Sequence, residues 1–271
     1  MRPQSLADLD PDLVRKTLLD AADAAASHTM PRFRTALAVD NKWAEGFDPV
    51  TEADRQAETV VRELIADRFP DHGIIGEEWD EKATQGRFQW IIDPIDGTRA
   101  YISGVPVWGT LIGLMIDGRA VAGLMAQPFT GETYLAMPGD AQYQRQGQTQ
   151  PLKTSKITEL AQAKLTTTTP DLFRKNDTEA QWNALWPQVL QTRYGLDCYG
   201  YCLMAAGHID LVVEAGLKDV DICPLIPLIE NAGGIVTTWD GGRAEKGGNC
   251  VAAATPELLE STLKVLRDAR T

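Results

Sequence analysis

The spacing of apolar residues predicts two helices near the N-terminus. The first is an Ala-rich amphipathic segment from Leu13 to about Ser27. It follows Asp10-Pro11, a pair typical of a helix start, because Asp caps the helix and the missing N–H of Pro is harmless in the first turn. A polar stretch, 41–49, separates this segment from a second predicted helix, from about Glu52 to Arg68.

From Gly73 onward the pattern changes to short apolar runs, which are typical of strands. Residues 73–76 and 90–93 form such runs, and each run leads into acidic residues. Residues 110–115 and 120–127 are predicted to pair through a turn at Asp117-Gly118. Further strands are expected at 132–137, 209–214, 235–239 and 250–254, and further helices at 198–206, 222–231 and 256–267. Residues 153–191 show no clear periodicity.

This order of elements predicts an α/β (α+β) fold with layered helices and antiparallel and mixed sheets. The 271 residues, of which 44% are hydrophobic, provide ample material for a core. We expect one unit, 1–271, with two halves at about 1–150 and 151–271.

Composition and charge exclude several classes of protein. No run approaches the roughly 20 apolar residues of a membrane span, and no basic region followed by an apolar run opens the chain, so a cytoplasmic location is expected. A net charge of −12 argues against binding to nucleic acid or to anionic membranes. The four cysteines match neither a CxxC redox motif nor a zinc ribbon, so buried reduced thiols are predicted.

The segment Trp90-Ile-Ile-Asp-Pro-Ile-Asp-Gly-Thr98 carries the strongest chemical signal. Asp93 follows a buried apolar run, and Pro94 keeps it extended. The chain then turns, which lets Asp93, the carbonyl of Ile95 and Asp96 converge on one point. Hard oxygen donors of this kind suit Mg²⁺. The alternative is a plain acidic turn, since Asp, Pro and Gly dominate turns.

Three other acidic positions carry a similar ambiguity. Glu77, in Gly76-Glu77-Glu78, follows a predicted strand, although paired surface acids are often merely solvated. Asp221, in Asp219-Val-Asp221, precedes a predicted helix, where an aspartate ordinarily acts as the N-cap. In the stretch Asp48-Pro-Val-Thr-Glu-Ala-Asp54, Thr51 and Asp54 form a capping-box pattern.

Together these motifs resemble the inositol monophosphatase superfamily over nearly the whole chain. The GEE motif, the DPIDGT motif and an aspartate 12 positions before Gly233 occur in the family's order. The resemblance implies an αβαβα sandwich, a homodimer, and a phosphomonoesterase with two or three Mg²⁺ ions in each site, in which a metal-activated water attacks in line. Val220 stands where the family usually has a tryptophan, which removes a packing group and no ligand.

Roles follow from the resemblance, position by position. Glu77, Asp93, Asp96 and Asp221 would be metal ligands, together with the carbonyl of Ile95. Thr98 with Glu77 would position the attacking water, and Gly97 with Thr98 would hold the phosphate. Asp54 would approach a further, water-rich metal position.

Three less general stretches, 102–110, 196–201 and 226–234, resemble the histidinol-phosphatase branch, which implies a role in histidine biosynthesis. Histidinol phosphate carries an ammonium group and an imidazole, so its pocket should offer acids. Asp197 and Glu214 are the expected pair. Alternatively, Asp197 caps the helix that begins near Cys198.

Three rival functions remain at this point. An inositol monophosphatase or broad-specificity sugar phosphatase would share every metal ligand. A haloacid-dehalogenase-type phosphatase is disfavoured, because its paired aspartates should end an early strand. A non-catalytic metal or phosphate sensor is disfavoured because none of the expected ligands is missing.

Overall fold

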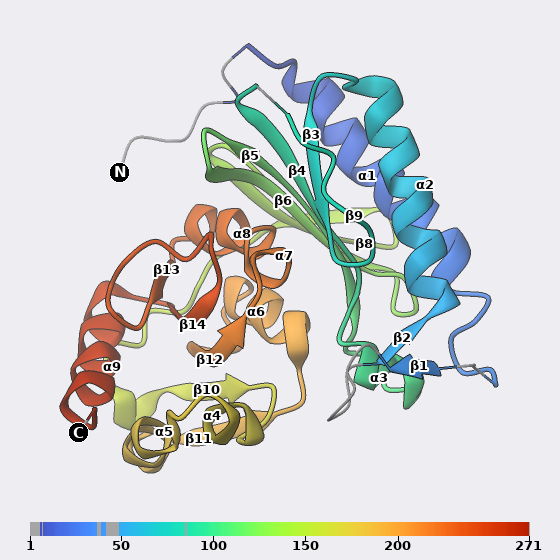
Figure 1. Ribbon diagram of the computed structural model, residues 1–271. Helices are drawn as coiled ribbons and strands as arrows, with labels where there is room; N and C mark the ends of the chain where they lie inside the picture. The colour runs from blue at the N-terminus through green and yellow to red at the C-terminus, as the bar shows by residue number, and fades with distance from the viewer. Residues whose placement is uncertain (1–5, 7, 37–38, 42–48, 85, 271) are drawn as a thin grey trace.

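The computed structural model describes residues 6, 8–36, 39–41, 49–84 and 86–270. Two β-sheets and three layers of helices alternate through the molecule (Figure 1). This confirms the predicted layered α/β sandwich. Residues 42–48, which include Asp48 and most of the predicted polar stretch, lie outside the described residues.

A seven-stranded sheet in the order β3-β4-β5-β6-β7-β8-β9 forms one inner layer. Only the β3–β4 pair is parallel among these neighbours, and the rest are antiparallel. The strands are β3 (Gly73–Gly76), β4 (Phe88–Asp96), β5 (Gly109–Ile116), β6 (Arg119–Gln127), β7 (Glu132–Met137), β8 (Asp140–Arg145) and β9 (Gln148–Pro151).

Helices α1 (Pro11–Thr29) and α2 (Glu52–Arg68) cover the outer face of this sheet (Figure 1). The side chain of Asp10 caps α1 by accepting a hydrogen bond from the backbone N–H of Asp12 at 3.0 Å. Trp90 and Ile92 of β4 pack towards these helices, whereas Ile91 packs into the core on the other face. A continuous apolar run therefore reflects a strand that is buried on both faces. A two-stranded ribbon, β1 (Val39–Asn41) and β2 (Pro49–Thr51), precedes α2.

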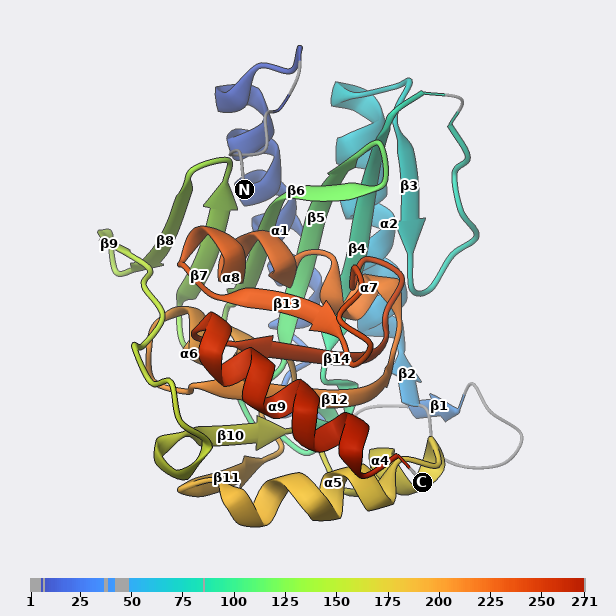
Figure 2. The same ribbon diagram turned by 90° about the vertical axis from the view of Figure 1, so that its left-hand side faces the viewer.

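A five-stranded mixed sheet in the order β11-β10-β12-β14-β13 forms the second inner layer. Its strands are β10 (Lys164–Thr167), β11 (Gln191–Tyr194), β12 (Leu211–Leu217), β13 (Ile235–Thr238) and β14 (Gly248–Ala253). The middle helical layer comprises α6 (Asp197–Ala205), α7 (Asp219–Ile222) and α8 (Leu225–Asn231). The outer helices are α4 (Asp171–Lys175), α5 (Glu179–Leu185) and α9 (Pro256–Asp268), and Figure 2 shows α9 lying across the sheet. Short 3₁₀ turns occur at η1 (Leu160–Gln162) and η2 (Trp186–Gln188), and the five-residue α3 (Thr98–Ile102) follows β4.

The junction between α7 and α8 lies directly on the seven-stranded sheet. A Cβ atom added to Gly123 of β6 would lie 1.9 Å from the carbonyl oxygen of Pro224, and one added to Gly113 of β5 would lie 3.1 Å from the Cα of Pro224. Only glycine permits so close an approach of helix and sheet. This contact brings α7 against β4 and so places residues of the two halves of the chain together.

Several sequence predictions need correction. The helix predicted at 222–231 is α8, which begins later, at Leu225 after its N-cap Pro224, and Ile222 is the last residue of a separate short helix, α7. Strand β4 does not end at Asp93 but runs to Asp96 through a register shift. The region without clear periodicity contains β10, α4, α5 and β11, all of them short. Strands β8 and β9 were not predicted, because their residues are mostly polar and half-buried or exposed.

All four cysteines are buried and unpaired, as predicted. In the described part of the chain, no helix is both long enough and apolar enough to cross a membrane.

Candidate active site

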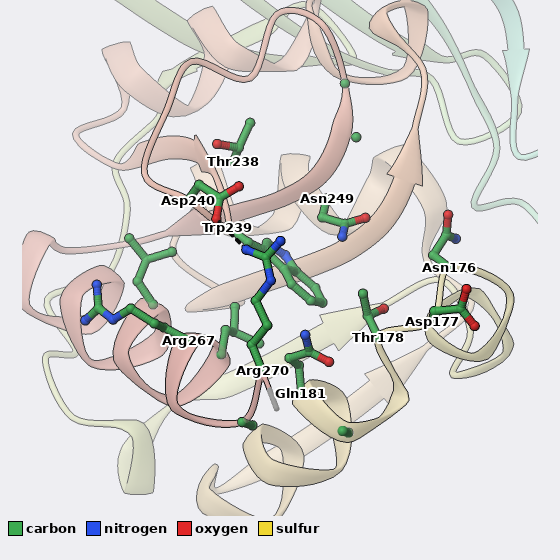
Figure 3. Close-up of a pocket in the computed structure, with 16 residues that line it drawn as sticks. Asn176, Asp177, Thr178, Gln181, Thr238, Trp239, Asp240, Asn249, Arg267 and Arg270 are labelled. Atoms are coloured by element: carbon green, nitrogen blue, oxygen red, sulfur yellow. Dashed lines mark hydrogen bonds and ion pairs between the residues drawn. The ribbon is translucent and has the colours of Figure 1, made fainter.

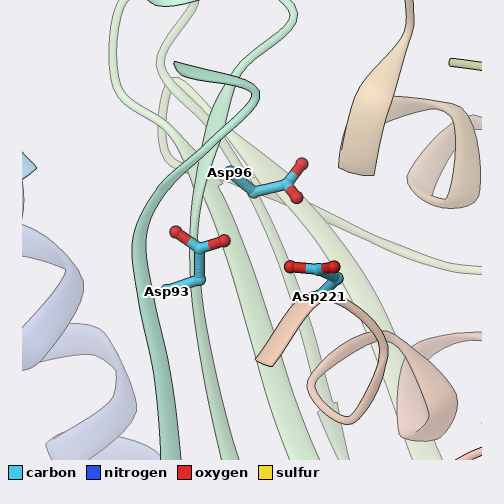
Figure 4. A group of neighbouring side chains, drawn as sticks. All are labelled: Asp93, Asp96 and Asp221. Carbon is cyan, nitrogen blue, oxygen red and sulfur yellow. The ribbon is translucent and has the colours of Figure 1, made fainter. Parts of the chain in front are cut away.

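Three aspartates from distant parts of the chain meet where the two halves touch. One carboxylate oxygen each from Asp93, Asp96 and Asp221 lies within 4.8 Å of the others. Figure 4 shows the three carboxylates around a common space, two from β4 and one from α7. We refer to these three residues as the aspartate cluster.

A bulge in β4 makes the cluster possible. Residues three apart on a regular strand point to opposite faces. In the β4–β5 pair, Asp93 is opposite Leu111 and Asp96 is opposite Gly109, so three steps on β4 match two on β5. The extra residue reverses the alternation and directs both aspartates to the same side. Pro94 lies in this bulge, where its missing N–H breaks no ladder bond.

Asp221 combines a structural bond with its place in the cluster. It is the third residue of α7, and one carboxylate oxygen accepts a hydrogen bond from the backbone N–H of Lys218 at 2.7 Å. The expectation that Asp219-Val-Asp221 precedes a helix is therefore wrong by one turn, since both acids lie inside it. A carboxylate has two oxygens, so closing the helix start and binding a cation are compatible.

Asp54 forms the predicted capping box at the start of α2. Its Oδ2 accepts hydrogen bonds from the N–H of Thr51 at 2.8 Å and from the hydroxyl of Thr51 at 2.5 Å. Its Oδ1 is buried and has no hydrogen-bond partner among the described residues. A buried carboxylate oxygen without a donor is costly unless a cation or a water satisfies it. The capping box therefore accounts for only half of this side chain.

Glu77 reaches towards α7 from the turn after β3. Lys218 donates to Glu77 Oε1 at 2.9 Å, and the side chain of Glu77 is only 13% exposed. Glu77 is also the largest charged contributor to the raised pKa of Asp93, which places its carboxylate beside the cluster. Lys218 was not predicted at this site, because its ion pair with Glu77 joins residues far apart in the chain.

A second missed residue, Glu58, holds the turn that presents Glu77. Glu58 is fully buried, and its carboxylate accepts hydrogen bonds from the N–H of Glu78 at 2.7 Å and from Arg62 at 2.6 Å. A Cβ atom on Gly76 would lie 1.9 Å from the same carboxylate, which explains why glycine opens the GEE motif. One sequence signal was available: Glu58 lies one helical turn after Asp54, on the apolar face of α2 beside Ala57 and Val61.

The residues after β4 form a tight turn beside the cluster. Gly97 has φ +82°, a left-handed conformation that other residues rarely adopt. The hydroxyl of Thr98 donates to the carbonyl of Ile95 at 3.1 Å, and the N–H of Ile95 donates to Asp93 Oδ1 at 3.0 Å. The carbonyl of Ile95 and the hydroxyl of Thr98, which were predicted to have separate roles, are therefore adjacent.

Asp197 and Glu214 line one cleft next to the cluster, together with Asp96, Asp221 and Thr168. Glu214 is buried and accepts hydrogen bonds from the N–H of Thr168 at 2.6 Å and from the hydroxyls of Thr168 and Thr167 at 3.0 and 3.1 Å. The two threonines come from the region without clear periodicity, and no motif predicted them at this site.

Asp197 does not cap α6, contrary to the alternative interpretation. It is the first residue of the helix, has φ +46°, and makes no capping bond. Instead, Oδ2 of Asp96 in β4 accepts a hydrogen bond from the N–H of Cys198 in α6 at 2.7 Å. An aspartate of the cluster therefore takes the place of the cap. A Cβ on Gly97 would lie 3.1 Å from the Asp197 carboxylate, which places Asp197 against the tight turn.

Burial shapes the electrostatics of the whole site. It raises the pKa of Asp54, Asp197 and Asp221 to about 6 and that of Glu214 to about 8. Burial, followed by the charges of neighbouring carboxylates, raises the pKa of Asp93 and Asp96 well above the usual value. Cations in the site would favour the charged forms and reverse these shifts.

The donor set fits a hard divalent cation. The cluster offers only carboxylate oxygens, and the unpaired Oδ1 of Asp54 and the carbonyl of Ile95 extend the same chemistry. Oxygen donors of this kind suit Mg²⁺, Mn²⁺ or Ca²⁺, whereas zinc sites in proteins favour histidine and cysteine.

The raised pKa values predict how stability depends on pH without metal. Asp54, Asp197 and Asp221 bind protons more tightly in the folded chain than in the unfolded chain. Their contribution to the stability of the fold is therefore full below about pH 4 and is lost as the pH rises through about 6. Glu214 extends the loss to about pH 8. In EDTA the melting temperature should therefore fall from pH 5 to pH 8, and Mg²⁺ should raise it more at pH 8 than at pH 5.

An Asp221→Asn variant should reduce both the fall in melting temperature between pH 5 and pH 8 in EDTA and the rise in melting temperature that Mg²⁺ causes. Asp23→Asn, the same substitution at an exposed position of α1, is the control and should leave both unchanged. A melting temperature in EDTA that rises steadily between pH 5 and pH 8 would contradict the assigned pKa shifts.

Glu58 is expected to position the Glu77 turn. Replacing Glu58 by Gln removes the charge that pairs with Arg62 and weakens the bond to the N–H of Glu78. We expect Mg²⁺ affinity, measured by calorimetry, to fall about tenfold, as is typical when a partner behind a metal ligand is lost. Glu63→Gln, at an exposed position of the same helix, should not change the affinity. Equal affinities in both variants would show that Glu58 serves only packing.

Comparisons with known proteins agree with this geometry. Residues 10–271 match the model of the inositol monophosphatase family. The chain is 37% identical over 243 residues to the chloroplastic bifunctional phosphatase IMPL2 of Arabidopsis thaliana, covering 89% of this chain and 68% of that protein. It is 34% identical over 234 residues to the histidinol-phosphatase of Chlorobaculum parvum, covering 86% of this chain and 88% of that protein. A solved inositol monophosphatase from Zymomonas mobilis superposes with a TM-score of 0.83 at 36% identity, covering 97% of this chain and all of that one. The chain therefore belongs to the inositol monophosphatase family.

Proposed function

We propose that this protein is a Mg²⁺-dependent phosphomonoesterase that hydrolyses L-histidinol phosphate to L-histidinol and phosphate, as a step of histidine biosynthesis in the cytoplasm. The observation that carries the proposal is the position of Asp197 and Glu214 in one cleft with two members of the aspartate cluster. The cluster suits the phosphate end of the substrate with its cations, and the other two carboxylates suit a cationic end.

The residues that would hold the cations are Glu77, Asp93, Asp96, Asp221 and the carbonyl of Ile95, with Asp54 at a further position. When bound, the two or three Mg²⁺ ions neutralise charge on the phosphate and lower the pKa of a water molecule. Thr98 and Glu77 orient the attacking water. The N–H groups of Gly97 and Thr98 bind phosphate oxygens, and no side chain is needed as a nucleophile.

The remaining carboxylates select the alcohol part of the substrate. Glu214 is buried and Asp197 is half-buried, so an ammonium or imidazolium group beside them forms charge-assisted hydrogen bonds in a site partly shielded from water. The hydrogen bonds from Thr167 and Thr168 keep Glu214 fixed, which lowers the entropic cost of binding. The name of the Chlorobaculum relative, a histidinol-phosphatase, supports this choice of substrate.

An inositol monophosphatase or broad-specificity sugar phosphatase is the second candidate. The solved structure from Zymomonas mobilis, described as an inositol monophosphatase, favours it. This candidate uses the same cluster and the same cations and differs only in what Asp197 and Glu214 contact. A comparison of substrates therefore separates the two.

The deciding experiment measures phosphate release from L-histidinol phosphate, myo-inositol 1-phosphate and a generic aryl phosphate, with Mg²⁺ and with EDTA. We expect a Mg²⁺-dependent rate that is highest on histidinol phosphate. A preference for the inositol ester would establish the second candidate. Absence of activity on all three esters, with Mg²⁺ or Mn²⁺ present, would refute the phosphatase proposal and favour a metal or phosphate sensor.

In the same assay, Asp197→Ala should lower kcat/KM for histidinol phosphate about 10- to 100-fold, the value of a hydrogen bond to a charged group. The aryl phosphate should lose much less, because it has no cationic end. Asp171→Ala, at an exposed position on α4, is the control. Equal losses on both substrates would remove the specificity argument.

A homodimer is also proposed. Trp186, Leu190 and Tyr194 are 44%, 67% and 47% exposed, and they lie in and beside β11, the edge strand of the five-stranded sheet. Exposed apolar residues on a sheet edge favour association with a second copy. Light scattering should give twice the chain mass of 29.7 kDa, and Leu190→Arg should reduce it. A monomeric wild type at micromolar concentration would contradict this proposal.

A further inference from the structure

A cavity of about 640 Å³ opens on the side of the molecule formed by the outer helices. It lies between α5, α9 and the ends of β13 and β14 (Figure 3). Its volume is within the range of small-molecule sites. No residue lines both this cavity and the cleft of Asp197 and Glu214, so the two sites are separate.

Gln181 gives the wall of the cavity a side-chain amide that can bond to a ligand. Only 8% of Gln181 is exposed, and its side-chain amide makes no hydrogen bond with any residue that the structure describes. Figure 3 shows this amide directed into the cavity. The amide is open to the space of the cavity, so it can bond to a polar ligand there. Asn249 lies across from it, and its Oδ1 accepts a hydrogen bond from the N–H of Gly216 at 3.1 Å.

The charges around the cavity suit a ligand with both signs. Asp177 lies at one end, and Arg270 lies at the other, paired with Asp240 at 3.0 Å (Figure 3). The side chains of Arg270 and Asp240 are 71% and 80% exposed, so their pairing contributes little and a ligand carboxylate can replace it. Between the two ends lies the indole of Trp239, which is fixed by a bond from its Nε1 to the carbonyl of Cys250 at 3.1 Å. A free amino acid carries a carboxylate, an ammonium group and a side chain that can pack on such a ring.

The wall of the cavity is bonded to the strand that carries Glu214. Asn249 accepts the N–H of Gly216, and Asn176 donates to the carbonyl of Ala215 at 3.4 Å. The β12–β14 register shifts between Glu214 and Leu217, and Gly216 has φ +77°. The wall also packs tightly here, since a Cβ on Gly247 would lie 2.3 Å from the carbonyl of Leu217.

This bulged segment, 215–218, connects the two sites. It begins directly after Glu214 and ends at Lys218, whose N–H holds the carboxylate of Asp221. A ligand that bonds to Asn249 or Asn176 therefore acts on groups that already hold the segment. Any shift of the segment changes the place of Lys218 and, through it, of Asp221 and Glu77.

We propose that this cavity is an effector site for a free amino acid and that its occupancy changes cation binding at the aspartate cluster. The carboxylate binds at Arg270, the ammonium group on the same carbon binds at Asp240, and the amides of Gln181 and Asn249 bind polar atoms of the ligand's side chain. The link to the cluster rests on the proposed metal site, whereas binding of the amino acid does not.

The test measures the melting temperature of the full chain with each of the twenty free amino acids, with and without Mg²⁺. At about a hundredfold excess over its Kd, a bound amino acid should raise the melting temperature by about 5 °C. Calorimetry should then show a change of about threefold in Mg²⁺ affinity when that amino acid is present. Removing either charged end of the ligand, as its methyl ester or its N-acetyl derivative, should abolish the shift.

Two variants identify the site. Gln181→Leu and Arg270→Ala should each lose the shift, whereas Gln150→Leu, on the exposed edge strand β9, should retain it. Arg270 is exposed, so its replacement tests the site even if Gln181→Leu fails to fold. No shift with any of the twenty amino acids, or a shift that survives in the folded cavity variants, would overturn the proposal.

Failure of the two proposals can be told apart. A shift that depends on Arg270, in a protein that binds no Mg²⁺, would keep the amino-acid site and refute the metal site. A shift with unchanged Mg²⁺ affinity would refute the coupling between the two sites.

Discussion

Repulsion between buried carboxylates is the constraint on which this active site depends. Asp93, Asp96 and Asp221 converge within 4.8 Å, with Asp54 and Glu214 buried and Asp197 half-buried around them. Burying one unpaired carboxylate costs several kcal/mol, and packing like charges together adds to that cost. The pKa values of these acids are raised as a consequence. An arrangement that is so unfavourable for stability alone is expected where divalent cations complete the site.

The fold holds this arrangement by giving each acid a structural bond as well. Asp54 closes the capping box of α2, Asp96 accepts the first-turn N–H of Cys198 in α6, and Asp221 closes the start of α7. Glu58 and Glu214 likewise accept backbone N–H groups. Backbone donors at element ends stabilise the charged form of a carboxylate without neutralising it. These bonds hold the acids in place and partly offset the rise in pKa that burial causes.

Glycine supplies the second requirement, which is close approach. The α7–α8 junction reaches the seven-stranded sheet only because Gly113 and Gly123 lack side chains, and Glu58 fits under the Glu77 turn only because residue 76 is glycine. The first contact brings the α7–α8 junction against the seven-stranded sheet. The second brings the turn after β3 against α2. The close approach of helix α7 to the sheet therefore both packs the middle helical layer and places Asp221 beside Asp93 and Asp96.

The sequence alone determined the parts of this protein that depend on neighbouring residues. The caps of α1 and α2, the hairpin of β5 and β6, the buried strand before Asp93 and the family membership follow from motifs within short windows. Turn and cap chemistry acts within a few residues, so a single sequence carries it completely. The convergence of Asp93 and Asp96 was predicted from their own motif, whereas the place of Asp221 beside them was predicted from the family resemblance.

Tertiary structure decided the contacts that join distant segments. Lys218 meets Glu77, Glu58 meets Gly76, Thr168 meets Glu214, and Asp96, in place of Asp197, satisfies an N–H at the start of α6. The cavity beside Gln181 exists only where α5, α9 and β14 come together. Apart from the position of Glu58 on the apolar face of α2, none of these contacts leaves a local signature, because each depends on how two sheets and three helical layers pack. That packing is fixed by the whole buried core, and no short stretch of sequence encodes it.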